Sequence, residues 1–141
     1  MIPTKSSIIE AHQKIKEFVH HTPLLSSTAI ANKAGCKSLY LKCENFQKIG
    51  AFKTRGAANR LRKLDPSVKT VCTHSSGNHA QALAYISSKL GIKAHIVMPQ
   101  NSPNIKVQAT MGYGATVTKS GNTMKERMEK CEEVKKKYNA V

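Results

Sequence analysis

The sequence contains no tryptophan, and aromatic residues make up 5% of its 141 positions. It also lacks an apolar run near the ~20 residues that a membrane-spanning helix needs. Its first residues, Met1–Lys5, lack the apolar stretch of a signal peptide. We therefore expect no membrane partner and a cytoplasmic location. The length is enough for one ordinary domain with its own core.

The four cysteines form no CxxC pair; they are Cys36, Cys43, Cys72 and Cys131. Zinc sites and disulfide frameworks use characteristic short spacings that are absent here. The pattern favours reduced thiols, which are typical of the cytosol. We predict no metal site in this segment.

Acidic residues are scarce, with 8 Asp and Glu against 23 Lys and Arg, and the formal net charge is +15. A basic domain favours nucleic-acid binding. However, basic residues are spread along the chain, and glutamates alternate with them from Lys125 to Lys137, as on a solvated helix face. No zinc-finger spacing, Arg-rich arm or RNP-type aromatic pattern is present. We expect no nucleic-acid partner and keep a basic nucleic-acid-binding module as the remote alternative.

Apolar periodicity and turn residues predict an α/β chain in which strands and helices alternate from residue 70 onward. This order is typical of βαβ units and a parallel sheet. Ala140 and Val141 resemble the first step of a further strand. The predicted helices are 7–18, 27–34, 54–64, 78–90, 103–111 (with Ser102 as N-cap) and 122–138, and the predicted strands are 38–43, 70–73, 94–98 and 116–118.

The segment Gly50–Ala57 places Lys53 between an aromatic residue and the small-residue start of a helix. That position suits a buried, reactive amine better than a surface charge. A lysine attacks an aldehyde only as the neutral amine, so we expect burial beside Phe52 and the helix N-terminus to lower its pKa. The alternative is a surface lysine that begins a helix. Gly50 and Gly56 favour the first interpretation, because glycine allows close backbone approach.

A second segment, Thr73–Ala80, joins an apolar strand to a helix through hydroxyls, a glycine and an amide. Such a turn exposes backbone N–H groups and helix-dipole charge that hold a carboxylate or phosphate. Ser76 can move a proton, and Asn78 can bond a cofactor oxygen. The alternative is that either residue is only a helix N-cap. His74 and His79 are of a type that is most often packed or capping.

Together these two segments resemble the fold-type II pyridoxal 5′-phosphate (PLP) enzymes, in the family of serine/threonine dehydratases and serine racemases. The resemblance implies an α/β fold like tryptophan synthase β, with parallel sheets flanked by helices and the C-terminal part of the fold absent. It implies the N-terminal portion of the large PLP-binding domain in residues 1–68 and most of the small domain in residues 69–141. Further matching motifs are His21–Leu24, Lys42–Lys48, Ile96–Pro99 and Tyr113–Ala115.

By this resemblance, Lys53 forms the Schiff base with PLP and takes the proton from the substrate α-carbon. Phe52 packs near the cofactor, and Asn78 bonds its 3′-oxygen. PLP is the electron sink, and the protein supplies orientation and acid/base groups. The loop that binds the substrate carboxylate consists of Ser75, Ser76, Gly77, Asn78 and His79.

Ser76 separates the reactions within the family. A racemase needs an acid/base group on each face of the planar carbanion, and serine racemases carry serine at this position where biosynthetic threonine dehydratases commonly carry alanine. The resemblance therefore implies racemisation of L-serine to D-serine with β-elimination to pyruvate and ammonia, using Lys53 and Ser76 on opposite faces. The alternatives are an L-threonine/L-serine dehydratase (ammonia-lyase) and a catalytically inert fragment that pairs with a full-length relative.

The resemblance also implies ligands and partners of a longer protein. Animal-type serine racemases bind ATP at the dimer interface, although Ala29 and Ile49 here replace a bulkier aliphatic residue and a threonine. By the same resemblance, the glycine-rich phosphate loop and the acidic divalent-metal site are expected beyond residue 141, and no GGGG-like run occurs in the sequence. The full-length enzyme is thus expected to be a homodimer that acts on serine or threonine, with PLP, Mg and ATP as ligands. The positions that correspond to the nucleotide site are Ser27, Thr28, Lys48, Gln81 and Tyr113.

Overall fold

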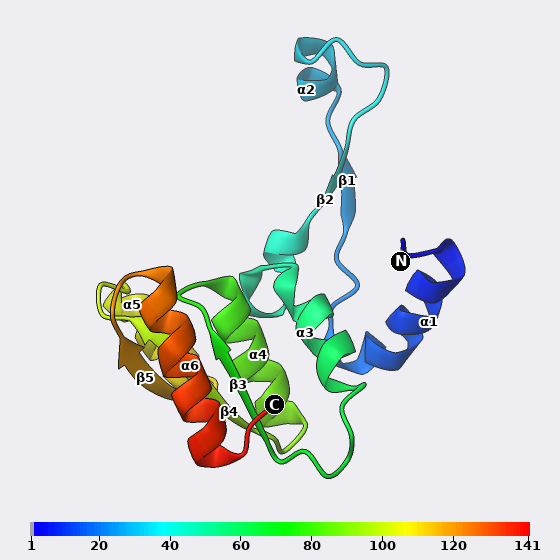
Figure 1. Cartoon of the computed structure of the whole chain (residues 1–141). Coiled ribbons are helices and arrows are strands. Elements are labelled where there is room, and N and C mark those ends of the chain that lie inside the picture. The colour runs from blue at the N-terminus through cyan, green and yellow to red at the C-terminus, as the bar shows by residue number, and fades with distance from the viewer. Residues whose placement is uncertain (1) are drawn as a thin grey trace.

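The computed structural model describes residues 2–141, so Met1, where the expected large-domain portion begins, lies outside the described residues. A sheet with helices on both faces forms the main body, and a long arm built from β1, α2 and β2 projects from it (Figure 1). In chain order the elements are α1 (Lys5–Ile15), the 3₁₀ turn η1 (Lys16–Phe18), β1 (Leu24–Ser26), α2 (Thr28–Lys33), β2 (Tyr40–Lys42), the 3₁₀ turns η2 (Glu44–Phe46) and η3 (Lys48–Gly50), α3 (Lys53–Leu61), β3 (Thr70–His74), α4 (Asn78–Lys89), β4 (Lys93–Pro99), α5 (Asn104–Gly112), β5 (Thr116–Ser120) and α6 (Met124–Tyr138).

Strands β3, β4 and β5 form the predicted parallel sheet, in that order. The central strand β4 is buried on both faces, as expected for a parallel strand covered by crossover helices. Ile96 and Met98 belong to the larger core cluster, whereas Val97 packs with Cys131 and Val134 of α6. Because side chains alternate along a strand, α6 covers the opposite face of the sheet from the main core.

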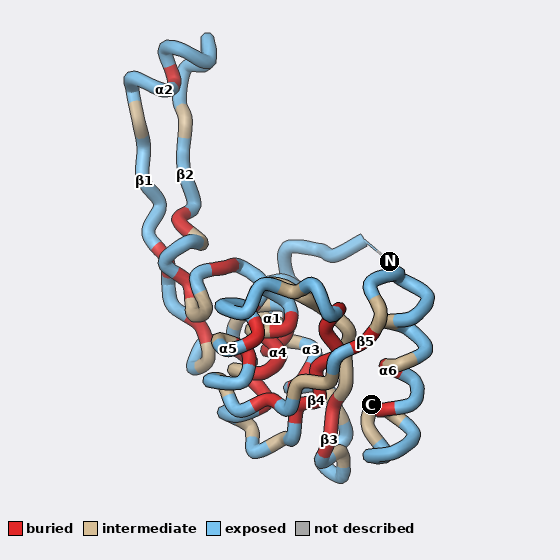
Figure 2. The backbone as a smooth tube through the Cα atoms, turned by 90° about the vertical axis from the view of Figure 1, so that its left-hand side faces the viewer, coloured by how far each residue is buried: buried red, intermediate tan, exposed pale blue. Residues whose placement is uncertain are grey.

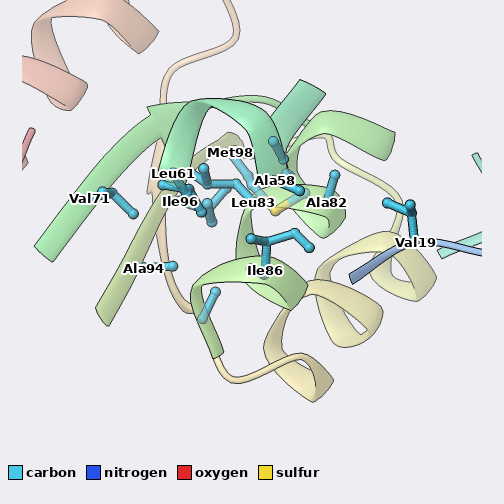
Figure 3. Close-up of a cluster of buried hydrophobic side chains, with 14 of the residues drawn as sticks. Val19, Ala58, Leu61, Val71, Ala82, Leu83, Ile86, Ala94, Ile96 and Met98 are labelled. Carbon is cyan, nitrogen blue, oxygen red and sulfur yellow. The ribbon is translucent and has the colours of Figure 1, made fainter. Parts of the chain in front are cut away.

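The main core continues from α3 into α4 (Figure 3). Ala57, Ala58 and Leu61 of α3 are buried in the same cluster as Leu83 and Ile86 of α4. Small side chains on α3 let the two helices approach closely. This shared core runs across the proposed boundary between residues 68 and 69, and the division into two domains stays a prediction.

Val141 adds a pairing at the free edge of β3. Its N–H donates to the Thr70 carbonyl (3.1 Å), and its carbonyl accepts from the Cys72 N–H (2.8 Å). Two bonds that flank one residue, here Val71, are the parallel ladder pattern. These two bonds agree with the prediction of a further strand at this point, although residues 140–141 are not assigned as a strand.

The arm was not fully predicted. β1 pairs with β2 in an antiparallel ribbon, with Leu24 opposite Lys42, yet only the second strand was expected. A three-residue strand offers a single apolar/polar alternation, which is too short to recognise. Both strands are exposed along their length (Figure 2), including Leu24 at 61% and Tyr40 at 67%.

Helix starts differ from the predictions where side-chain caps decide them. Thr4 caps α1, so the helix starts before residue 7, and its end tightens into η1. The assignment of Ser102 as N-cap is wrong, because Pro103 has ψ 133° and is itself the residue before α5. Thr123 is the N-cap of α6 and forms a capping box with Glu126, so the helix begins at Met124, two residues later than predicted.

His95 on β4 stacks on Tyr138 of α6, with ring centroids 4.0 Å apart. Its burial, and then the charge of Lys93, lower the pKa of His95 below its ordinary 6.5. The unfolded chain therefore binds this proton more readily, and we expect the free energy of unfolding to fall as pH drops below about 6.5. Urea denaturation at pH 7 and pH 5 measures the effect. His95→Phe should reduce the pH dependence while keeping a ring at this position; equal pH dependence in the two proteins contradicts the assignment.

Candidate active site

An ion pair and its hydrogen bonds join three segments on either side of Lys53. Arg55 donates from Nε to Glu44 Oε2 (2.9 Å) and from Nη2 to Oε1 (2.7 Å), and Thr22 Oγ1 donates to the same Oε1 (2.6 Å). Lys42 Nζ donates to the Thr22 carbonyl (2.6 Å). The Arg55 hydrogen bonds are the main reason why the pKa of Glu44 falls to about 2, although burial opposes them. We call this group, Thr22, Glu44 and Arg55, the clamp.

Gln47 extends the clamp. Its side chain is buried and accepts the His20 N–H (2.7 Å) while donating to the His20 carbonyl (2.9 Å). Gln47 Oε1 also accepts the Lys48 N–H (2.9 Å). A buried amide that satisfies both of its ends in this way fixes the turn from which the Lys53 loop begins.

The loop between Gln47 and Lys53 has an unusual backbone. Ile49 has φ 59°, a region that β-branched residues rarely adopt, and such strain costs about 1–3 kcal/mol. Gly50 follows with φ 69°, which explains a glycine there. Thr54 Oγ1 donates to the Lys48 carbonyl (2.7 Å) and closes the loop. At Gly56, an added Cβ would meet no described atom within 4 Å beyond its chain neighbours and the backbone of its own helix, so packing within residues 2–141 does not explain that glycine.

Lys53 is the first residue of α3, one residue earlier than the predicted helix start at Thr54, and the expectation that it is buried is wrong for this chain. Its Nζ lies 5.0 Å from the centroid of the Phe52 ring, which is itself 59% exposed. No described element covers this side of the loop. The amine is therefore open to solvent and to a reagent.

The loop after β3 leaves the start of α4 without a side-chain cap. Gly77 is the N-cap and makes no side-chain hydrogen bond, so the alternative that Ser76 or Asn78 serves only as the cap is wrong. The Ser75 N–H donates to the Val97 carbonyl (3.0 Å), and the Gly77 N–H to Ser75 Oγ (3.4 Å). These bonds hold the turn, while the first N–H groups of α4 have no capping side chain and suit an anion.

The two loops lie close to each other because α3 packs along α4. Partial burial is the main cause that lowers the pKa of His79, and the nearby charges of Lys53 and His74 lower it further. The Lys53 ammonium beside an uncapped helix start attracts an anionic ligand. The structure thus brings Lys53 together with the loop Ser75–His79.

The positions matched to a nucleotide site are not gathered within one chain. Ser27 caps α2 by accepting the Ile30 N–H (3.3 Å), and α2 lies at the tip of the arm, far from α4 and α5 (Figure 1). Gln81 lies on α4, and Tyr113, which follows α5, packs edge-on against Tyr85. Residues of one chain therefore do not assemble this site by themselves.

The sequence did not predict the clamp or the contacts of Gln47. Glu44 and Gln47 lie within a motif that carried the resemblance, and Arg55 is two residues after Lys53. Nothing in their spacing indicates an ion pair, because the partners are 11 residues apart across two turns and a helix start. Their position inside matching motifs was the only available signal.

The described part of the chain has neither a metal-binding cluster nor a membrane-spanning helix. Residues 2–141 contain no group of three His, Cys, Asp or Glu side chains placed to hold a metal ion. Among these residues, no helix is both long and apolar enough to cross a membrane.

Comparison with known proteins decides the family. The family model described as pyridoxal-phosphate dependent enzyme matches residues 15–141. The chain belongs to this family of PLP-dependent enzymes. The predicted fold class, a fold-type II α/β arrangement with a parallel sheet flanked by helices, is confirmed.

Individual proteins similar to this chain include serine racemases and an ammonia-lyase. The serine racemase of Dictyostelium discoideum is 48% identical over 126 residues, which cover 88% of this chain and 39% of that protein. The L-threo-3-hydroxyaspartate ammonia-lyase of Saccharomyces cerevisiae is 43% identical over 129 residues, covering 90% and 39%. The structure of maize serine racemase matches with a TM-score of 0.91 and 45% identity, over 96% of this chain and 42% of that chain. The chain spans about two fifths of the length of these relatives.

Proposed function

We propose that the chain supplies the N-terminal portion of a PLP-dependent enzyme that racemises L-serine to D-serine and also eliminates serine to pyruvate and ammonia. The observation that carries the proposal is the position of Lys53, at the start of α3 and beside the uncapped start of α4. The similarity to a serine racemase and to an ammonia-lyase supports this pair of reactions.

The residues present fit PLP. Lys53 offers an exposed primary amine for the aldehyde of the cofactor, Phe52 offers an aromatic face beside it, and Asn78 offers an amide at the start of α4. When bound, PLP supplies an electron sink that spreads the negative charge developing at the substrate α-carbon. The phosphate cradle is not among these residues, and we propose that it comes from the remainder of the fold.

Each proposed role follows from the chemistry of a side chain or backbone group. The free N–H groups in the loop Ser75–His79 bind the substrate carboxylate and orient the α-carbon. Lys53 Nζ removes the α-proton from one face. Ser76 Oγ, which is not used as a helix cap, delivers a proton to the other face. Inverting the α-carbon requires both groups, whereas elimination of water requires only the first.

An L-threonine/L-serine ammonia-lyase is the second candidate. The similarity to an ammonia-lyase favours it, and it would use the same lysine and the same carboxylate loop. Ser76 distinguishes the two candidates, because only racemisation needs a proton donor on the second face.

For the full-length enzyme we propose a homodimer, with Mg and ATP as additional ligands.

The exposed arm supports the proposal that this chain is catalytically incomplete by itself. Leu24, Leu25 and Leu41 expose 61%, 50% and 44% of their surfaces, and an isolated two-stranded ribbon is only marginally stable in water. We propose that the part of the fold which the relatives carry beyond this match packs on the arm. The chain alone should bind PLP weakly and turn over little substrate.

Covalent attachment of PLP tests the site without requiring turnover. The chain is incubated with PLP, reduced with borohydride and mapped by peptide mass spectrometry. We expect the label to concentrate on Lys53, and Lys53→Ala to lower labelling of that peptide about tenfold or more, because the attachment needs an amine. Lys106→Ala, at an exposed position on α5, is the control and should leave Lys53 labelled. A label spread evenly over the surface lysines of the wild-type chain would overturn the proposal.

A further inference from the structure

We infer that Cys72 and Cys131 form a reversible disulfide site that fastens α6 to β3. The two sulfur atoms lie 3.4 Å apart, although the residues are 59 positions apart in the sequence. Cys72 Sγ also lies 3.9 Å from the Cys131 carbonyl oxygen. The inference goes beyond the proposed function and does not depend on it.

The surroundings of the pair favour a bond between the two sulfurs over metal binding. Cys131 is 6% exposed and packs with Val97 and Val134, while Cys72 is half-buried and packs at the edge of this cluster. Within residues 2–141, no third His, Cys, Asp or Glu joins the two thiols to complete a group that could hold a metal. Cys72 therefore offers the access for a reagent, and Cys131 lies directly behind it.

The other two cysteines differ from this pair. Cys36 is exposed and donates to the Ala31 carbonyl (3.6 Å), and Cys43 is buried and donates to the Leu41 carbonyl (3.5 Å). Both belong to the arm or its base, away from α6. Of the four cysteines, only Cys72 and Cys131 have a thiol partner within hydrogen-bonding distance.

A small-molecule disulfide such as oxidised glutathione balances the reaction. The Cys72 thiolate attacks one glutathione sulfur, forms a mixed disulfide and releases one glutathione thiolate. The Cys131 sulfur then attacks Cys72 Sγ, forms the protein disulfide and releases the second thiolate. The two protein sulfurs are oxidised, one glutathione disulfide is reduced, and the two thiol protons end on the two glutathione molecules.

The environment makes this reaction slow at neutral pH. Burial, followed by the hydrogen bond and charge of Cys131, raises the pKa of Cys72 to about 12, with Lys135 opposing and Glu132 adding to the shift. The thiolate is the nucleophile, so its small population limits the rate. Below the pKa, this population grows about tenfold for each pH unit, and the rate should follow it.

The cross-link would act on the strand that leads into the carboxylate loop. Cys72 lies on β3, which ends at His74 directly before Ser75. α6 contacts both β3 and β4. A bond between Cys72 and Cys131 would therefore hold α6 against the base of this loop and restrict movement of the two elements relative to each other.

The experiment uses a Cys36→Ser/Cys43→Ser variant, which keeps only the pair. It is incubated with oxidised glutathione at pH 7, 8 and 9, followed by intact-mass measurement and peptide mapping. We expect the mass to fall by two hydrogen atoms, a peptide that joins residues 72 and 131, and reversal by dithiothreitol. The rate should rise about tenfold per pH unit, and the oxidised form should melt at a higher temperature.

The matched variant is Cys131→Ala, which should stop at a mixed disulfide on Cys72. The inference is overturned if both cysteines are present and glutathione stays on Cys72, if disulfide-linked dimers form, or if no oxidation occurs at pH 9. Should the Cys36→Ser/Cys43→Ser variant fail to fold, the same peptide map of the wild-type chain decides, since peptides that contain Cys36 or Cys43 differ in mass from the linked pair.

Discussion

Glu44→Gln is expected to lower the free energy of unfolding by about 2–3 kcal/mol at pH 7, because it leaves the Arg55 guanidinium without its carboxylate partner. The side chains of Glu44 and Arg55 are only 19% and 29% exposed, so solvent screens the pair incompletely. The lowered pKa of Glu44, about 2 against an ordinary 4.5, is consistent with this magnitude after a discount for solvent. Urea denaturation followed by circular dichroism measures the loss.

The pH dependence gives a second readout of the same pair. Because the pKa of Glu44 is lowered in the folded chain, its contribution is fully present above about 4.5 and is lost as pH falls from 4.5 toward 2. The difference between the wild-type chain and Glu44→Gln should therefore shrink at pH 3. Glu133→Gln is the matched control, since it breaks an exposed pair with Lys130 (2.6 Å) that should contribute under about 0.5 kcal/mol. Equal losses in the two variants would contradict the role of the clamp.

Ser76→Ala should separate the two reactions of the proposed enzyme. We expect formation of D-serine to fall by about 10²–10⁴-fold, which is the usual effect of removing a positioned proton donor, while formation of pyruvate is largely kept. Lys53 still removes the α-proton, so elimination can continue. The measurement is a parallel assay of D-serine and pyruvate with this chain joined to the C-terminal remainder of the Dictyostelium discoideum serine racemase.

Ser75→Ala is the control for this experiment. Ser75 Oγ accepts the Gly77 N–H and shapes the carboxylate loop (3.4 Å), so its loss should weaken both reactions together. A parallel loss of both products in Ser76→Ala would instead assign Ser76 to substrate binding. That result would favour the ammonia-lyase over the racemase as the proposed function.

The sequence alone determined the elements whose signals are local. Strands β3, β4 and β5 and the helices between them were predicted, because apolar runs, caps and glycine stops act within a few residues. Their alternation was enough to predict a parallel sheet. The motifs around Lys53 and Ser76 carried the correct family, since long runs of matched residues rarely arise by chance.

Tertiary structure alone decided which distant residues meet and which stay exposed. The clamp joins Glu44 to Arg55 across two turns and a helix start, and Cys72 meets Cys131 only because α6 folds back onto β3. The exposure of Lys53 depends on what covers its loop, and no local pattern encodes that cover. Periodicity specifies a face of a helix or strand, whereas contacts between faces depend on the packing of the whole fold.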